Sequence, residues 1–151
     1  IIIPRHVNRS VEIKESLEKL NLKVHLDQPE KKIDFNTDIY LVNSYGKTKS
    51  FYRYCQNVFL GGSMIKHGGQ NPIEAVRFGC SVLHGPNIEN FKEIYEFLKK
   101  NKISHNITKK KELVDKLIQL FSKRAKSKKI QRKIQLIGNQ ILKKTYNEIC
   151  H

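Results

Sequence analysis

The sequence predicts an α/β fold in which a Rossmann-like parallel β-sheet carries helices on both faces. Short, β-rich apolar runs alternate along the chain with longer stretches whose apolar residues recur at helical spacing. The length of 151 residues suits one domain with its own apolar core. The three cysteines are odd in number and include no C-x-x-C pair. We therefore expect neither a disulfide framework nor a four-ligand zinc site.

The expected elements follow one another in a βα order. Strands are expected at "IIIP", "LKVHL", "DIYLV", "NVFLGG" and "SVLHG". Helices are expected over residues 9–21, 71–79 and 90–100, and two longer helical patterns follow over residues 110–122 and 128–150. In the last helix one apolar stripe is formed by Ile130, Ile134, Ile137, Ile141, Thr145 and Ile149. This stripe needs a partner, which is the sheet domain, a second domain or a membrane interface.

The positive charge of the chain is concentrated in its last third. The formal net charge is +15, yet residues 1–98 contain 13 Lys and Arg against 11 Asp and Glu, whereas residues 99–151 contain 16 against 3. Such a block is suited to nucleic acid or to an anionic membrane surface. The alternative is that the lysines only solvate exposed helix faces. No apolar run approaches the ~18 residues of a membrane span, and no signal-peptide pattern is present.

A glycine-rich stretch, "FLGGSMIKHGGQNPIEAVRFGCSVLHGP", has the layout of a ligand site. An expected strand ends in Gly61-Gly62-Ser63, a second turn follows at Gly68-Gly69, and Asn71 and Pro72 suit the N-cap and first position of a helix. Ligands of open α/β sheets bind at such strand ends, and helix N-termini favour a phosphate or carboxylate. The stretch is neither a Walker A loop nor a G-x-G-x-x-G fingerprint.

Glu74 has two interpretations that spacing alone does not separate. It lies three residues after Asn71, where its carboxylate can accept a hydrogen bond from the backbone of the cap residue. It can equally accept hydrogen bonds from a pair of sugar hydroxyls beside a bound phosphate.

Three segments together resemble a known family. "IIIPRH", "VNSYGK" and "VFLGGSMIKHGGQNPIEAVRFGCSVLHGPNIENF" are similar, in order and spacing, to the carboxyl-terminal half of bacterial 3-deoxy-D-manno-octulosonic acid (Kdo) transferases, glycosyltransferases of the GT-B fold. The resemblance implies an inverting transfer of Kdo from CMP-Kdo to a lipid A precursor in lipopolysaccharide biosynthesis, with neither a metal nor another cofactor. It places the general base, the acceptor surface and the membrane anchor in the amino-terminal half, so we expect no catalytic residue in this chain.

The resemblance also assigns residues to the donor site. CMP or donor contacts are implied for Pro4, Arg5, Tyr45, Gly46, Lys47, Asn71, Pro72, Ile73 and Glu74. A guanidinium such as that of Arg5 suits a phosphate, although a solvated surface charge is the ordinary alternative. A loop for the phosphate or the donor carboxylate is expected from Gly61, Gly62, Ser63, His67, Gly68 and Gly69. His67 would touch the carboxylate when protonated; otherwise it is a solvated loop residue.

One motif departs from the family. Kdo transferases usually read D-T-x-G-E where this chain reads Asn43-Ser44-Tyr45-Gly46-Lys47, so a base stands at the position of an acid. If only the backbone of Tyr45 and Gly46 contacts the nucleotide, binding is kept. If the acidic side chain takes part, the affinity or the base preference changes.

The resemblance implies a place for the whole protein in the cell. We expect it at the cytoplasmic face of the bacterial inner membrane, with the lipid A precursor reached through an amino-terminal domain, an anionic membrane surface as a further partner and no nucleic acid; the chain itself is expected to be soluble. Residues 1–122 are expected to form the CMP-Kdo domain, without its first strand, and residues 123–151 a basic helix that packs on it or across the cleft. The chain lacks an initiating Met, so we expect a part of a longer protein. The alternative function is a basic module that binds polyanions or membrane surfaces.

Overall fold

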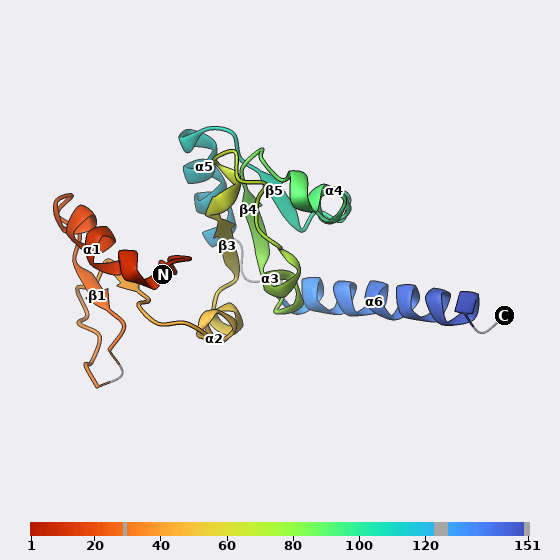
Figure 1. Cartoon of the computed structure of the whole chain (residues 1–151), viewed down its shortest axis with the longest axis horizontal. Helices are drawn as coiled ribbons and strands as arrows, with labels where there is room; N and C mark the ends of the chain where they lie inside the picture. Colours follow the sequence, from red (N-terminus) through yellow and green to blue (C-terminus); the bar gives the residue numbers. More distant parts are fainter. Residues whose placement is uncertain (29, 123–126, 150–151) are drawn as a thin grey trace. The chain divides into compact units, whose positions relative to one another are not determined.

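The computed structural model describes residues 1–28, 30–122 and 127–149 and divides into two compact units, Ile1–Ser50 and Phe51–His151. Strand pairing is parallel in both units, and hydrogen bonds group the strands into one sheet of two strands and one of three (Figure 1). The predicted α/β class with parallel strands is confirmed. The expected division into residues 1–122 and 123–151 stays a prediction, and residues 123–126, 150 and 151 lie outside the described part of the chain.

The first unit consists of a short parallel sheet with one α-helix packed against it. A 3-10 turn, η1 (Val7–Arg9), leads into α1 (Ser10–Glu18), which packs against β1 (Val24–Leu26). β1 pairs with β2 (Ile39–Leu41) so that Val24 lies beside Ile39.

The strand expected at "IIIP" is reduced to one bridge, between Ile2 and Leu41. Ile2 donates to the carbonyl of Tyr40 and accepts from the amide of Val42. The next residue to face the same neighbour is Pro4, which has no N–H to donate, so the ladder stops there.

The second unit holds the three-stranded sheet and most of the helices. Helix α2 (Thr48–Tyr54) contains the boundary between the units. Neither this helix nor the edge strand β5 (Ser104–Asn106) was expected from the sequence. The remaining elements are β3 (Asn57–Leu60), η2 (Gly61–Ser63), α3 (Ile73–Arg77), β4 (Ser81–His84), η3 (Glu89–Phe91), α4 (Lys92–Lys100), β5 (Ser104–Asn106), α5 (Lys110–Phe121) and α6 (Ser127–Ile149). The strand order is β3-β4-β5, and the central strand β4 is buried at all four positions.

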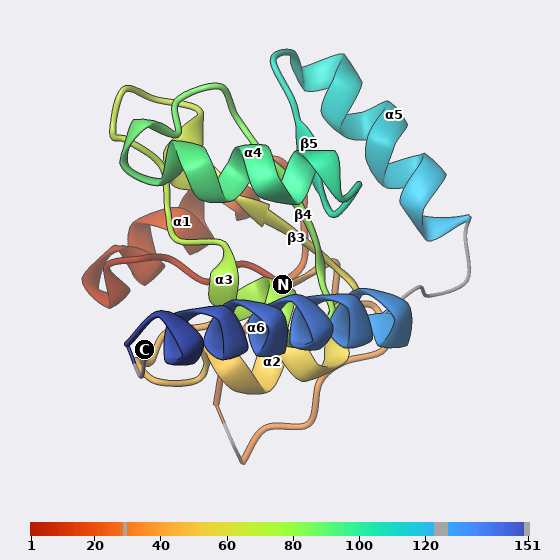
Figure 2. The same cartoon turned by 90° about the vertical axis from the view of Figure 1, so that its right-hand side faces the viewer.

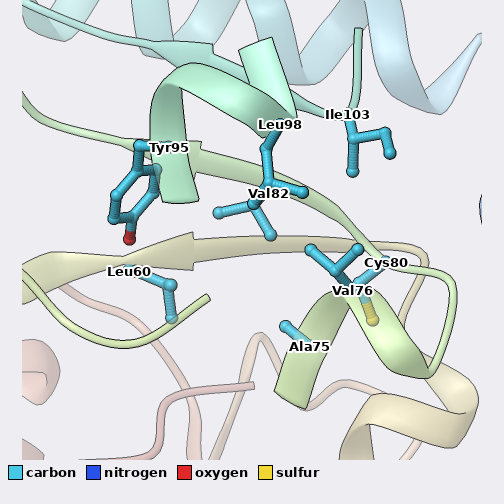
Figure 3. Close-up of a cluster of buried hydrophobic side chains, with 8 residues drawn as sticks. All are labelled: Leu60, Ala75, Val76, Cys80, Val82, Tyr95, Leu98 and Ile103. Atoms are coloured by element: carbon cyan, nitrogen blue, oxygen red, sulfur yellow. The ribbon is translucent and has the colours of Figure 1, made fainter. Parts of the chain in front are cut away.

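The core of the second unit lies between this sheet and helices α3 and α4. Figure 3 shows its buried side chains, which are Leu60, Ala75, Val76, Cys80, Val82, Tyr95, Leu98 and Ile103. The Cys80 thiol donates to the carbonyl oxygen of Cys55 at 3.0 Å and is fully buried. This contact ties the turn after α3 to the end of α2.

Helix α6 packs on this core through the first half of its apolar stripe. It lies beside α3 (Figure 2), and Ile130 and Ile134 contact the core cluster. Thr145 and Ile149, farther along the stripe, are exposed, and the side chain of Ile141 lies outside the described residues. Within residues 1–28, 30–122 and 127–149 no helix has the length and apolar character that a membrane crossing requires.

Candidate functional site

The candidate residues of the first unit gather at one edge of its sheet. Pro4 and Arg5 follow the bridge at Ile2, and the segment Asn43–Lys47 follows β2. Because Ile2 and β1 both pair in parallel with β2, the residues that follow each strand lie at the same sheet edge. Arg5 and Tyr45 are exposed there, whereas Pro4 is half-buried. The structure thus brings together the two segments that were expected to contact a nucleotide in this unit.

An ion pair connects that edge to the interior of the first unit. Asp27, which directly follows β1, is only 7% exposed and accepts a hydrogen bond from the Lys47 ammonium at 2.7 Å. The Tyr40 hydroxyl donates to the other carboxylate oxygen at 2.7 Å, and the Ser44 hydroxyl donates at 3.4 Å. The carboxylate is therefore held by the strand β2 and by both ends of the segment Ser44–Lys47.

These bonds keep Asp27 charged although it is buried. Burial acts to raise the pKa of the Asp27 carboxyl, but the hydrogen bonds from Lys47 and Tyr40 and the charge of Lys47 outweigh it, and the pKa lies below its usual value. The hydrogen bond that Tyr40 donates to Asp27 also raises the pKa of the Tyr40 hydroxyl. Lys47, the base at the position where the family has an acid, thus neutralises a buried carboxylate of its own chain.

The backbone conformation at position 46 favours a glycine. The φ of Gly46 is +82°, in the left-handed region, and a Cβ placed on it would meet no atom of residues 1–28, 30–122 and 127–149 within 4 Å. Crowding within the chain therefore does not explain a glycine here. The backbone of this turn is open on the side where a Cβ would point.

In the second unit a serine joins the loops that follow two neighbouring strands. Ser63, at the carboxyl end of β3, is fully buried; its hydroxyl donates to the carbonyl of Leu60 at 2.5 Å and accepts from the amide of Gly85 at 2.6 Å. The Ser63 carbonyl accepts from the backbone and side-chain N–H groups of Asn87. A Cβ at Gly85 would overlap with that carbonyl. The loops after β3 and β4 are therefore locked together.

The second glycine pair serves the same packing. Gly68 and Gly69 have φ of +75° and +80°. A Cβ at Gly68 would overlap with the side chain of Asn90, and one at Gly69 would lie 3.1 Å from the carbonyl oxygen of Asn87. The close neighbours of this pair belong to the chain itself. His67, which precedes the pair, is exposed.

Helix α3 begins one residue later than the capping pattern suggested. Its first residue is Ile73, with Pro72 at the N-cap position, and the Asn71 side-chain oxygen accepts from the Ile73 amide at 3.0 Å. The expected N-cap position of Asn71 is therefore wrong by one residue, although its side chain still binds the first amide of the helix. Glu74 is exposed on the first turn of α3, and its charge contributes to the raised pKa of Tyr52, whose main cause is burial.

A buried histidine closes the carboxyl end of β4. His84 is 2% exposed; its Nδ1 lies 2.7 Å from the Gly85 carbonyl, and its ring packs against Tyr95 with centroids 4.3 Å apart. A carbonyl only accepts, so Nδ1 carries the proton, and the buried Nε2 has no hydrogen-bond partner among the described residues. Burial, above all, lowers the pKa of His84. Its burial therefore favours the neutral form of the ring.

The expected site residues thus form two groups, one in each unit. The first contains Pro4, Arg5 and Tyr45–Lys47, and the second contains the loop Gly61–Gly69 and the turn Asn71–Glu74. Sequence reasoning missed Asp27 and Tyr40. No local pattern marks either residue, since Asp27 meets its partner Lys47 twenty positions along the chain.

Parallel βαβ topology with loops gathered at the carboxyl ends of the strands defines a Rossmann-like α/β domain of the ligand-binding kind. No family model matches the chain. The crystal structure of the C-terminal CMP-Kdo binding domain of WaaA from Acinetobacter baumannii is similar, with a TM-score of 0.77, 26% identity, and coverage of 86% of this chain and 69% of that one.

Curated relatives carry the same family name. A 3-deoxy-D-manno-octulosonic acid transferase of Haemophilus influenzae is 32% identical over 98 residues, covering 65% of this chain and 23% of the relative. One of Aquifex aeolicus is 26% identical over 144 residues, covering 95% and 39%. The chain therefore spans well under half the length of these relatives. The resemblance drawn from the motifs is confirmed: the chain is homologous to the carboxyl-terminal domain of Kdo transferases.

Proposed function

We propose that this chain is the donor-binding domain of a Kdo glycosyltransferase and binds the CMP part of CMP-Kdo. The observation that carries the proposal is the likeness, over 86% of the chain, to a domain described as binding CMP-Kdo. The gathering of the candidate segments at the carboxyl ends of parallel strands supports it, because ligands of such folds bind at those ends. The alternative of a general polyanion-binding module is not favoured by these comparisons.

Each candidate segment has a role that suits its chemistry. The exposed Arg5 guanidinium pairs with the phosphate of CMP through two N–H donors. The open backbone at Tyr45 and Gly46 reads the edge of the cytosine ring. Glu74, exposed on the first turn of α3, accepts hydrogen bonds from the ribose hydroxyls. Asn71 and Pro72 set the start of that turn, and the loop Gly61–Gly69 lies beside the donor carboxylate.

The whole protein transfers Kdo to a lipid A precursor with inversion. The acceptor hydroxyl loses its proton to a general base and attacks the anomeric carbon of Kdo, while the bond from that carbon to the phosphate oxygen breaks and CMP leaves. The Arg5 guanidinium stabilises the negative charge that develops on the phosphate as CMP leaves. The base and the acceptor surface belong to the amino-terminal half of the protein, at the cytoplasmic face of the inner membrane, and neither a metal nor a cofactor takes part.

A nucleotide titration tests the proposal. The 151-residue chain is titrated with CMP, and with UMP and AMP as controls, while backbone amide chemical shifts are followed. We expect saturable shifts at Arg5, Tyr45–Lys47 and Asn71–Glu74, with CMP preferred. Shifts that are equal for the three nucleotides and spread over the lysines of α5 and α6 would refute it, because they would report charge attraction alone.

A further inference from the structure

The shape of the segment Asn43–Lys47 is fixed by hydrogen bonds to Asp27, a residue outside the segment. The segment contains one left-handed residue, Gly46, and its side chains at Ser44 and Lys47 both donate to the same carboxylate, that of Asp27. Asp27 is in turn fixed by the Tyr40 hydroxyl and by its own amide, which donates to the Leu41 carbonyl at 2.8 Å. The open turn is thus tied at two points to a buried carboxylate that directly follows β1.

We propose that the Asp27–Lys47 ion pair positions the Gly46 backbone for the cytidine nucleotide, so that Lys47 acts as a positioning residue and not as a ligand contact. This inference rests on the proposed function of the chain. Asp27 is buried while the Lys47 side chain is 38% exposed, so the pair reaches from the interior of the unit to the rim of the candidate site. On this proposal the attraction between residues 27 and 47 holds the turn at Gly46, and the same attraction would act if the two charges were exchanged.

The arrangement dictates what an acid at residue 47 would do in this chain. A glutamate there would place a second carboxylate beside the buried charge of Asp27, with no cation between them. Like charges at this distance repel, and the Asp27 carboxylate would lose its strongest hydrogen-bond donor. Lys47 is therefore coupled to Asp27 in this chain.

A charge-exchange experiment tests the coupling. CMP dissociation constants are measured for the full chain, for Lys47→Glu, for Asp27→Lys and for the double variant Asp27→Lys/Lys47→Glu. We expect each single variant to weaken CMP binding about tenfold or more, because a buried charge is left without its partner, and the double variant to recover most of the loss. Lys47→Arg, which keeps the cation, is expected to stay within about threefold of the parent chain.

A matched control is available in α1 of the same unit. Lys14 and Glu18 form an ion pair with the same 2.7 Å separation, but both side chains are partly exposed. Lys14→Glu is expected to change CMP affinity less than about twofold, because exposed pairs contribute little. Amide shifts of β1 and β2 in each variant report whether the sheet of this unit is intact.

The outcomes are separable. Recovery in the double variant supports the inference, because a lysine that contacted the phosphate itself would not be replaced by a cation at residue 27. A double variant that keeps its β1 and β2 shifts and binds no better than Lys47→Glu overturns the inference, as does a Lys47→Glu variant that binds CMP like the parent chain. A parent chain that does not bind CMP refutes the proposed function, and the inference with it.

Discussion

The Ser63 hydroxyl accepts a hydrogen bond from the Gly85 amide at 2.6 Å, and both residues are buried where the loops after β3 and β4 meet. Gly85, like Gly68 and Gly69 in the same stretch, lies where an added Cβ would meet residues of the other loop. They allow two loops of the chain to approach each other, and the approach sets the shape of the strand ends. Gly46, in the other unit, is different, because no atom of the described residues lies within 4 Å of a Cβ placed there.

Replacement of Ser63 should destabilise the second unit. Ser63→Ala removes the acceptor of the buried Gly85 amide, and leaving such a donor unsatisfied costs about 1–3 kcal/mol. The free energy of unfolding from urea titration measures the loss. Ser122→Ala, in an exposed serine at the end of α5, should stay within about 0.5 kcal/mol of the parent chain. Equal effects of the two substitutions would mean that the loops are not locked by Ser63.

Two glycine-to-alanine substitutions should change the free energy of unfolding in opposite directions. Gly85→Ala forces a Cβ into the Ser63 carbonyl and should cost about 1–3 kcal/mol of unfolding free energy, as overpacking does elsewhere. Gly138→Ala, in α6, meets no atom within 4 Å and should stabilise by about 0.5–1 kcal/mol because alanine favours a helix. Thermal unfolding midpoints distinguish the two. A neutral Gly85→Ala would contradict the close approach of the loops.

The second unit should lose stability in mild acid. Burial, aided by Lys116 and His84, lowers the pKa of His105 from 6.5 to about 4, and burial chiefly lowers that of His84. Between these values the unfolded chain binds protons that the folded chain does not, so this part of the stability is complete above pH 6.5 and falls as the pH decreases toward about 4.

Urea titrations at several pH values test this dependence. His105→Gln should flatten the decline between pH 6.5 and about 4, whereas His6→Gln, in an exposed residue of the other unit, should leave it unchanged. An unchanged decline in His105→Gln would show that other groups cause it.

Helix α6 should depend on Ile134 for its packing. Ile134 is half-buried against the core cluster, so Ile134→Ala should cost about 1–2 kcal/mol, less than a fully buried isoleucine would. Leu136→Ala, two residues away, removes a side chain that is 64% exposed and should change the unfolding free energy by less than about 0.5 kcal/mol. If both substitutions cost the same, the stripe of α6 does not pack on α3 as described.

The sequence predicted those features that local pattern determines. The run "SVLHG" became the buried central strand β4. A helix follows Asn71 as expected, with the Asn71 side chain bound to its first amide and Pro72 at the N-cap. The edge strand β5 was missed because "SHN" is polar and only three residues long. Helix α2 was missed because its seven residues carry no clear apolar period.

The site was predictable in its segments and not in its contacts. Motif resemblance placed Gly46 after a strand and Glu74 at the start of a helix, which is where the structure has them, whereas Arg5 follows a single bridge and not a strand. The roles of Asp27 and Tyr40 depend on a pairing between β1 and β2 that brings distant residues together. From the motif, Lys47 was a departure whose consequence for nucleotide binding stayed open, and only the contact with Asp27 gives it a structural role.

The central claim, recognition of a cytidine nucleotide, is tested most directly by calorimetric titration of the chain with CMP and with UMP at low and at high salt. We predict that CMP binds about tenfold more tightly than UMP, since a site that pairs with the cytosine edge leaves polar groups unpaired with uracil, and that this ratio persists at high salt. Equal affinities for the two nucleotides, both lost as salt is raised, would contradict the account and leave only attraction to the net charge of +15.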